Sequence, residues 1–284
     1  MNRCEHEMLD ILKSLRQDYG AVSVKAEFEA EGTRTDELLR LIDIARRADL
    51  MVGLKIGGAE AVRDLIESKQ YGVEYIIAPM VETPYALTKF IDAKNKFYSA
   101  EQREYTKFLF NVETSTTFNN LDQMIKIGAE PNGVQGAVFG RVDFVGSTGG
   151  SRDRINTDEI TQYVIKTAKA CKTAGLELVV GGAVAIESLA ELAKVRAIHL
   201  TRFETRKVIF QGNALDNPKM TKGLEQTVHF ELLWLKNKRD YYAHIQDEDA
   251  ARIAMLESRW SKLSSNVSVA TLETRWSKLS SNVS

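Results

Sequence analysis

Residues 107–144 read KFLFNVETSTTFNNLDQMIKIGAEPNGVQGAVFGRVDF: a short apolar run, a longer amphipathic stretch and a second apolar run. The runs Lys107–Val112 and Val134–Val142 are nearly continuous in apolar residues, and Thr116–Ile127 between them has helical spacing. Strands of this kind, alternating with helices, are typical of a parallel sheet that is covered on both faces.

The same alternation continues on both sides of this stretch. Five further strand-like runs are Ala21–Phe28, Leu50–Ile56, Val73–Met80, Leu176–Val180 and Ala197–Phe203. Seven strands are one short of a closed barrel, so the eighth is expected near the N-terminus or after Val208. We therefore predict an α/β fold, a (β/α)8 TIM-type barrel. A doubly wound open sheet is the alternative, which the lack of a G-x-G-x-x-G motif after the first strand disfavours.

Composition and charge limit the partners. Of the 284 residues, 44% are hydrophobic and 27% are charged, and the net charge of -1 gives no reason to expect nucleic acid or a membrane surface as partner. No stretch reaches the roughly 18 apolar residues of a membrane span, and no signal peptide is recognised at the start. Cys4 and Cys171 match no metal or redox spacing, which indicates reduced thiols. We expect a cytoplasmic protein.

The end of the chain has a different texture. We expect the barrel to span residues 1–228 and a helical extension to span residues 229–284. Within the extension, Glu257–Ser268 recurs almost letter for letter as Glu273–Ser284, with a period of 16 residues. Either this repeat packs Trp260 and Trp276 on a partner subunit, or it is a recent duplication without a role. The first interpretation favours a homo-oligomer, which we expect.

Charged residues alternate along the first predicted strand. Lys25, Glu27 and Glu29 are spaced by two, which places them on one side of a strand. Three charges on a buried face are costly unless they pair or meet a ligand. The alternative is a solvated edge strand.

Two neighbouring strands are followed by carboxylates. Glu113 closes the fourth strand and Asp143 the fifth, and the βα loops of a barrel gather at one face. Mg²⁺ usually takes one or two protein carboxylates, so this pair is a candidate metal site. On spacing alone, a carboxylate that caps the next helix is an equal explanation.

The segments FNVET (residues 110–114), NNLD (119–122) and FGRVDF (139–144) resemble the HpcH/HpaI aldolase and citrate lyase β-subunit superfamily. The segment VEYIIAPMVET (73–83) is similar to another strand of that family, so the resemblance covers roughly residues 20–210. It implies a phosphoenolpyruvate/pyruvate-type barrel in which Glu113 and Asp143 bind Mg²⁺ or Mn²⁺. The separation of 30 positions between these two residues is close to the spacing that the family shows.

Two positions depart from the family pattern. Lys55 stands where the family has an arginine that grips the substrate, and lysine keeps the charge but loses the bidentate fork. The family's histidine base is also missing, and Glu29 or Glu31 is the replacement that this sequence offers. These departures bear on the reaction more than on the fold.

The resemblance implies a divalent-metal-dependent carbon–carbon lyase that acts on a small 2-oxo acid or related carboxylate through an enolate. Lys55 and Glu29 are then the catalytic candidates, and the substrate-binding candidates are Lys25, Gly140, Arg141 and Arg206. For Arg206 a surface charge cluster is the alternative. Other enolate, phosphoenolpyruvate or thioester chemistry on the same metal site, and a non-catalytic barrel scaffold, are the alternative functions.

Overall fold

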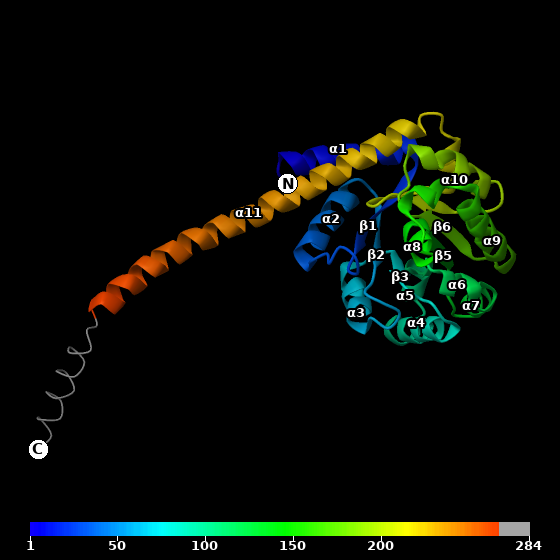
Figure 1. Ribbon diagram of the computed structural model, residues 1–284, viewed down its shortest axis with the longest axis horizontal. Helices are drawn as coiled ribbons and strands as arrows, with labels where there is room; N and C mark the ends of the chain where they lie inside the picture. Colours follow the sequence, from blue (N-terminus) through cyan, green and yellow to red (C-terminus); the bar gives the residue numbers. More distant parts are fainter. Residues whose placement is uncertain (267–284) are drawn as a thin grey trace, which may run out of the picture. The chain divides into compact units, whose positions relative to one another are not determined.

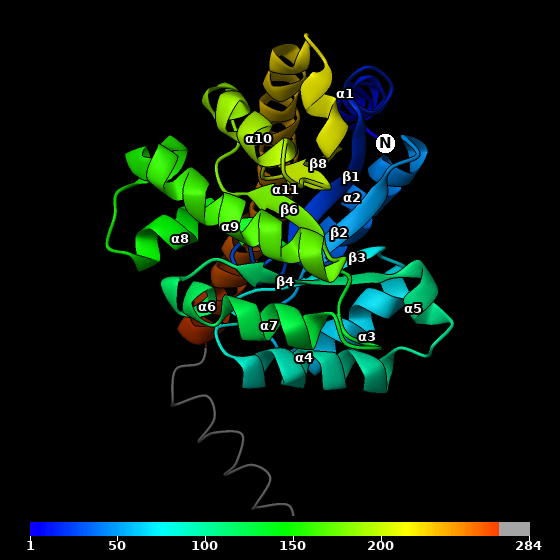
Figure 2. The same cartoon turned by 90° about the vertical axis from the view of Figure 1, so that its right-hand side faces the viewer.

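Eight strands close into a barrel in the computed structural model, which describes residues 1–266. The strands follow one another around the barrel in chain order and lie inside a ring of helices (Figures 1 and 2). They are β1 (Ala21–Glu27), β2 (Met51–Lys55), β3 (Tyr75–Ala78), β4 (Lys107–Val112), β5 (Gly136–Gly140), β6 (Glu177–Gly181), β7 (Arg202–Glu204) and β8 (Val208–Gln211). The predicted TIM-type barrel is confirmed, and the eighth strand begins at Val208.

The eighth strand runs in the opposite direction to the others. Strands β1 to β7 pair in parallel, whereas β8 pairs antiparallel with both β7 and β1. Only Thr205, Arg206 and Lys207 separate β7 from β8, and a parallel crossover needs a dozen or more residues. The chain therefore turns back in a hairpin at the carboxyl end of β7.

Eleven α-helices occur in the described residues. They are α1 (Arg3–Tyr19), α2 (Thr35–Arg47), α3 (Val62–Tyr71), α4 (Pro84–Phe97), α5 (Gln102–Tyr105), α6 (Ser115–Asn119), α7 (Leu121–Gly128), α8 (Arg141–Ser147), α9 (Asp158–Ala174), α10 (Leu189–Arg196) and α11 (Met220–Asn266). Short 3-10 helices span Arg152–Asn156, Ile186–Ser188 and Gly212–Asp216. None of these described helices is long and apolar enough to cross a membrane.

Several predicted strands are shorter than expected, and the fifth and the seventh differ most. The fifth ends at Gly140, so Arg141 and Asp143 lie in the first turn of α8 and not in a strand. Asp143 is favourable in the first turn of a helix, because its carboxylate interacts with the positive end of the helix dipole. The seventh begins only at Arg202, because the backbone of residues 197–199 continues to bond with the end of α10.

The barrel interior has three levels. At the amino end of the strands, Glu177 accepts hydrogen bonds from Lys107 Nζ at 2.5 Å and from Arg202 Nη2 at 2.6 Å. An apolar level follows, formed by Tyr75, Ile77, Leu109, Val138 and Val179. Polar side chains return at the carboxyl end, where the candidate site lies.

The chain divides into two compact units, residues Met1–Trp234 and Leu235–Ser284. The predicted boundary at residue 228 falls inside α11, whose first turns belong to the barrel unit. Phe230, Leu233 and Trp234 are buried there, which accounts for the position of the division. The second copy of the repeat, with Trp276, lies outside the described residues.

Candidate functional site

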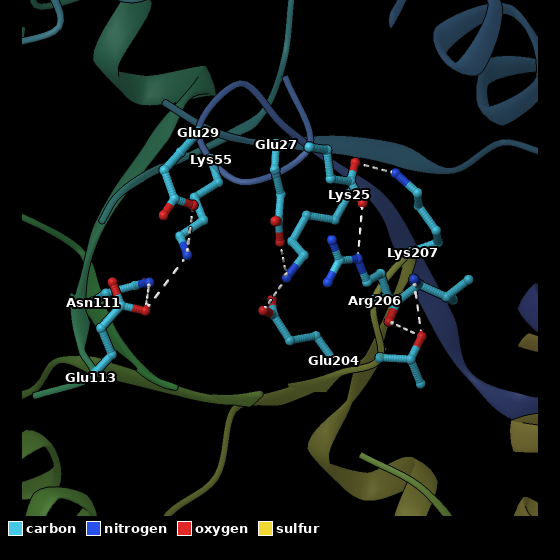
Figure 3. A network of polar contacts seen from close by, with 12 residues as sticks. Lys25, Glu27, Glu29, Lys55, Asn111, Glu113, Glu204, Arg206 and Lys207 are labelled. Atoms are coloured by element: carbon cyan, nitrogen blue, oxygen red, sulfur yellow. Dashed lines mark hydrogen bonds and ion pairs between the residues drawn. The ribbon is translucent and has the colours of Figure 1, made fainter. Parts of the chain in front are cut away.

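Charged side chains from several strands face one another at the carboxyl end of the barrel (Figure 3). Lys25 Nζ lies 2.5 Å from Glu204 Oε1 and 3.1 Å from Glu27 Oε1. Burial alone lowers the pKa of Lys25, but the two carboxylates outweigh burial and raise this pKa far above its ordinary value. Lys25 is therefore a permanent cation between two anions.

Lys55, at the end of β2, is the second buried cation. Its Nζ lies 3.2 Å from Glu29 Oε2 and 3.5 Å from Glu113 Oε2. Burial by itself lowers the pKa of Lys55, but Glu113, Glu29 and Glu27 together raise it. Lys55 thus contacts both Glu29 and Glu113, and all three residues were singled out in the sequence.

The carboxylate of Glu113 is held on all sides, and its side chain is only 1% exposed. Oε1 accepts from the Met80 amide at 2.8 Å, and Oε2 accepts from Asn111 Nδ2 at 2.6 Å. Met80 has φ 49°, a left-handed conformation that costs energy in a residue other than glycine. Burial raises the pKa of Glu113, Lys55 opposes this, and the charge of Asp143 raises the pKa further.

Asn111 is a site residue that the sequence analysis missed. It precedes Glu113 by two positions, and period-two alternation was the signal that would have found it. Its Oδ1 atom is buried and has no hydrogen-bond partner among residues 1–266. A buried acceptor without a donor is costly, so this atom indicates that a ligand or water completes the site.

Two paired glycines make room for the buried glutamates. Gly140 and Gly181 are partners in the register of β5 and β6. A Cβ atom at Gly140 would lie 2.9 Å from Glu113 Cβ, and one at Gly181 would lie 2.8 Å from Glu204 Oε1. Gly140 therefore acts on the site by the absence of a side chain. Glu204, the last residue of β7, was not predicted as a site residue, because the predicted seventh strand ended one residue before it.

Arg141 and Asp143, both in α8, have different surroundings. The Arg141 guanidinium is buried and donates to the carbonyls of Gly181 at 3.1 Å and Gly182 at 2.9 Å. Burial lowers the pKa of Arg141 to about 10, and Glu191 opposes this shift. Arg141 thus ties α8 to the loop after β6, whereas Asp143 is exposed and acts on Glu113 through its charge.

Arg206 lies in the turn between β7 and β8, apart from the lysine–glutamate pairs. Its Nε lies 3.1 Å from Glu31 Oε1, and Lys207 Nζ pairs with Glu31 Oε2. These three residues form a separate charged cluster at the carboxyl end of the barrel.

The donor set suits a hard divalent cation. Within residues 1–266 no group of three or more His, Cys, Asp or Glu side chains is arranged to hold a metal. Mg²⁺ needs only one or two protein carboxylates, and Glu113 and Asp143 are oxygen ligands of that kind. A cation between them would relieve the burial of Glu113 and its repulsion by Asp143, and the unpartnered Asn111 Oδ1 lies beside the same carboxylate.

A closed barrel with its polar side chains at the carboxyl ends of the strands defines a TIM-type barrel, a fold that places active sites at this end. Residues 21–209 match the HpcH/HpaI aldolase/citrate lyase family. The chain belongs to this family, whose members include lyases.

Solved structures share the fold at low sequence identity. The HpcH/HpaI aldolase from Desulfitobacterium hafniense is 14% identical with a TM-score of 0.55, over 78% of this chain and 87% of that one. Citrate synthase SbnG is 18% identical with a TM-score of 0.56, over 82% and 90% of the two chains. Malate synthase from Haloferax volcanii, a lead(II) complex, is 10% identical with a TM-score of 0.55, over 76% and 68%. The chain matches none of the curated proteins in sequence.

Proposed function

We propose that this protein makes or breaks a carbon–carbon bond in a small 2-oxo acid or related carboxylate, through an enolate. The observation that carries the proposal is the Lys55 ammonium, buried at the barrel mouth between Glu29 and Glu113. A fixed and buried cation stabilises negative charge that develops on a nearby oxygen. Membership of an aldolase and citrate lyase family supports this chemistry.

Each proposed residue has one task. Lys55 faces the oxygen on which the enolate charge develops, and its raised pKa keeps it charged. Glu29, in contact with Lys55, accepts or returns the proton. Glu113 and Asp143 are the proposed ligands of Mg²⁺ or Mn²⁺, and the bound ion would supply Lewis-acid polarisation of the substrate's oxygens.

The remaining candidates support this centre. Gly140 leaves the space that Glu113 occupies, and Arg141 positions α8, from which Asp143 projects. Lys25 holds Glu27 and Glu204 in place on the other side of the barrel mouth, where it offsets part of the negative charge that an anionic substrate would meet. Arg206 is the most exposed of the proposed substrate contacts.

Thermal unfolding with metal and substrate tests the proposal. Mg²⁺ or Mn²⁺ at millimolar concentration should raise the Tm, because a ligand that binds only the folded state stabilises it. Asp143→Asn should remove most of this gain. Pyruvate or oxaloacetate should raise the Tm further only when metal is present, and Lys55→Met should weaken that second step while leaving the first.

Lys107→Met is the matched control for Lys55→Met. Lys107 is also an ion-paired lysine of a barrel strand, but it lies at the amino end of β4, where 44% of its side chain is exposed. Its substitution should leave both ligand-induced shifts unchanged. A protein whose Tm does not respond to metal would contradict the proposed mechanism and favour a non-catalytic barrel. A response to metal without one to oxo acids would favour other chemistry on the same site.

A further inference from the structure

The reversed direction of β8 has a consequence for the barrel mouth. The turn of Thr205, Arg206 and Lys207 lies at the carboxyl end of β7, the end at which the candidate site lies. Thr205 fixes the turn, because its backbone N–H donates to the Val208 carbonyl at 2.9 Å and its Oγ1 accepts from the Val208 N–H at 3.2 Å. Two consecutive cations are thereby placed at the mouth on a short, rigid turn.

The two cations are held differently. Lys207 is buried, with 4% of its side chain exposed, and its ammonium pairs with Glu31. Its Nζ also lies 5.8 Å from the centre of the Trp234 ring. The side chain of Arg206 is 51% exposed and contacts Glu31 through Nε. Among residues 1–266, its two terminal amino groups have no hydrogen-bond or ion-pair partner.

The charge of Arg206 extends into the candidate site. Burial alone raises the pKa of Glu27, but Lys25, Lys55 and, more weakly, Arg206 lower it. Glu27 and Glu231 in turn act on Arg206 at longer range than Glu31. Arg206 is therefore electrostatically coupled to the lysine–glutamate pairs while its guanidinium faces solvent.

We propose that Arg206, backed by Lys207, binds a second anionic group of the substrate, distal to the 2-oxo carboxylate that reacts at Lys55. This inference rests on the proposed function and narrows its substrate class to oxo acids with a further carboxylate or a phosphoryl-type group. A guanidinium that is anchored through Nε presents its terminal amino groups as a planar fork, which matches either kind of anion. Lys207 adds a second positive charge. Among the described residues, Glu31 is the one carboxylate in contact with these two cations, so the cluster keeps a net positive charge.

Three ligands with one head group test the inference. Pyruvate, oxaloacetate and phosphonopyruvate share the 2-oxo carboxylate and differ at C3, which carries hydrogen, a carboxylate or a phosphonate. Binding of each in the presence of Mg²⁺ is measured by calorimetry for the wild type, Arg206→Gln and Arg206→Lys. Arg63→Gln is the matched control, because Arg63 also pairs with a glutamate through Nε but lies on the surface of α3.

The wild type should bind at least one of the two dianionic ligands more tightly than pyruvate. Arg206→Gln should lower the affinity for that ligand by about tenfold, as expected for the loss of a charge-assisted contact. The affinity for pyruvate should change by less than about twofold. Arg206→Lys should restore part of the loss, and Arg63→Gln should change nothing. The ligand whose affinity falls in Arg206→Gln shows whether Arg206 binds a carboxylate or a phosphonate.

Two results would overturn the inference, and they are distinguishable. The second anion site is contradicted, and the proposed function stands, if pyruvate binds as tightly as both dianions. The same holds if Arg206→Gln lowers the affinity for all three ligands equally. If none of the three ligands binds to a protein that binds Mg²⁺, both the inference and the proposed function are wrong.

Discussion

Among the single side chains of the site, Glu27 links the two lysines, since both lower its pKa against the effect of burial. Glu27→Gln should reduce the free energy of unfolding at neutral pH by about 1–3 kcal/mol, because Lys25 loses one of its two partners. A depressed carboxyl pKa stabilises the fold above the ordinary value of 4.5, and this contribution is lost as pH falls through the lower pKa of the folded state. Denaturant unfolding should therefore show the two proteins converging at acid pH.

Glu67→Gln provides the control for that measurement. Glu67 also pairs with a cation, Arg63 at 2.7 Å, but this pair lies on the surface, where ion pairs contribute about 0–1 kcal/mol. Glu67→Gln should change the free energy of unfolding only slightly at every pH. A Glu27→Gln protein that unfolds like the wild type at neutral pH would show that the buried pair does not stabilise the fold.

The protonation state of Lys55 separates two kinds of aldolase chemistry. A lysine that forms a Schiff base must lose its proton, whereas Glu113, Glu29 and Glu27 raise the pKa of Lys55. Borohydride reduction in the presence of pyruvate should consequently leave no adduct on Lys55 near neutral pH. Mass spectrometry of the digested protein makes this measurement, and a reduced adduct at Lys55 would contradict the electrostatic role.

Among the strands, β5 and β6 come close to the buried glutamates only through glycine. Gly140→Ala would place a Cβ 2.9 Å from Glu113 Cβ and 3.0 Å from its Oε2, so the carboxylate must move. We expect a loss of about 1–3 kcal/mol in unfolding free energy and a loss of the Tm response to Mg²⁺. Gly146→Ala is the control: in α8 nothing lies within 4 Å of the added Cβ, and alanine is the better helix former. Equal metal responses in the two variants would contradict the role given to Gly140.

The sequence predicted the parallel strands because their apolar runs are nearly continuous, and period two placed Lys25 and Glu27 on one face. It did not predict the direction of β8, since a run of four residues carries no sign of its orientation. Glu204 was missed because the predicted seventh strand ended at Phe203, one residue before it. Asp143 was assigned to a strand end, because the apolar neighbours of a short helix give the same letters as a strand. Met80 contributes its backbone N–H to the site, and a pattern of side chains does not reveal such a contact.

At the scale of the whole chain, the repeat is the feature that the barrel does not explain. In the described part of the first copy, Trp260 is 72% exposed and Leu263 is also exposed. Ile253 and Leu256, which precede the copy on α11, are exposed as well. If the repeat packs on a partner subunit, Trp260→Ala combined with Trp276→Ala should lower the oligomeric state or the Tm. Analytical ultracentrifugation and thermal unfolding measure this, with the exposed barrel residue Tyr105→Ala as control. Unchanged sedimentation and melting would leave the repeat without this role.

The central claim is that Lys55 and its neighbours stabilise an enolate, and exchange of the C3 hydrogens of pyruvate tests it most directly. In D₂O with Mg²⁺ or Mn²⁺, the wild type should replace these hydrogens with deuterium, which proton NMR follows as loss of the methyl signal. Lys55→Met should slow the exchange by about a hundredfold or more, the usual effect of removing a group that stabilises developing charge. Lys107→Met should exchange at the wild-type rate. Wild-type exchange no faster than that of pyruvate and metal alone, or a Lys55→Met protein as fast as the wild type, would contradict the account.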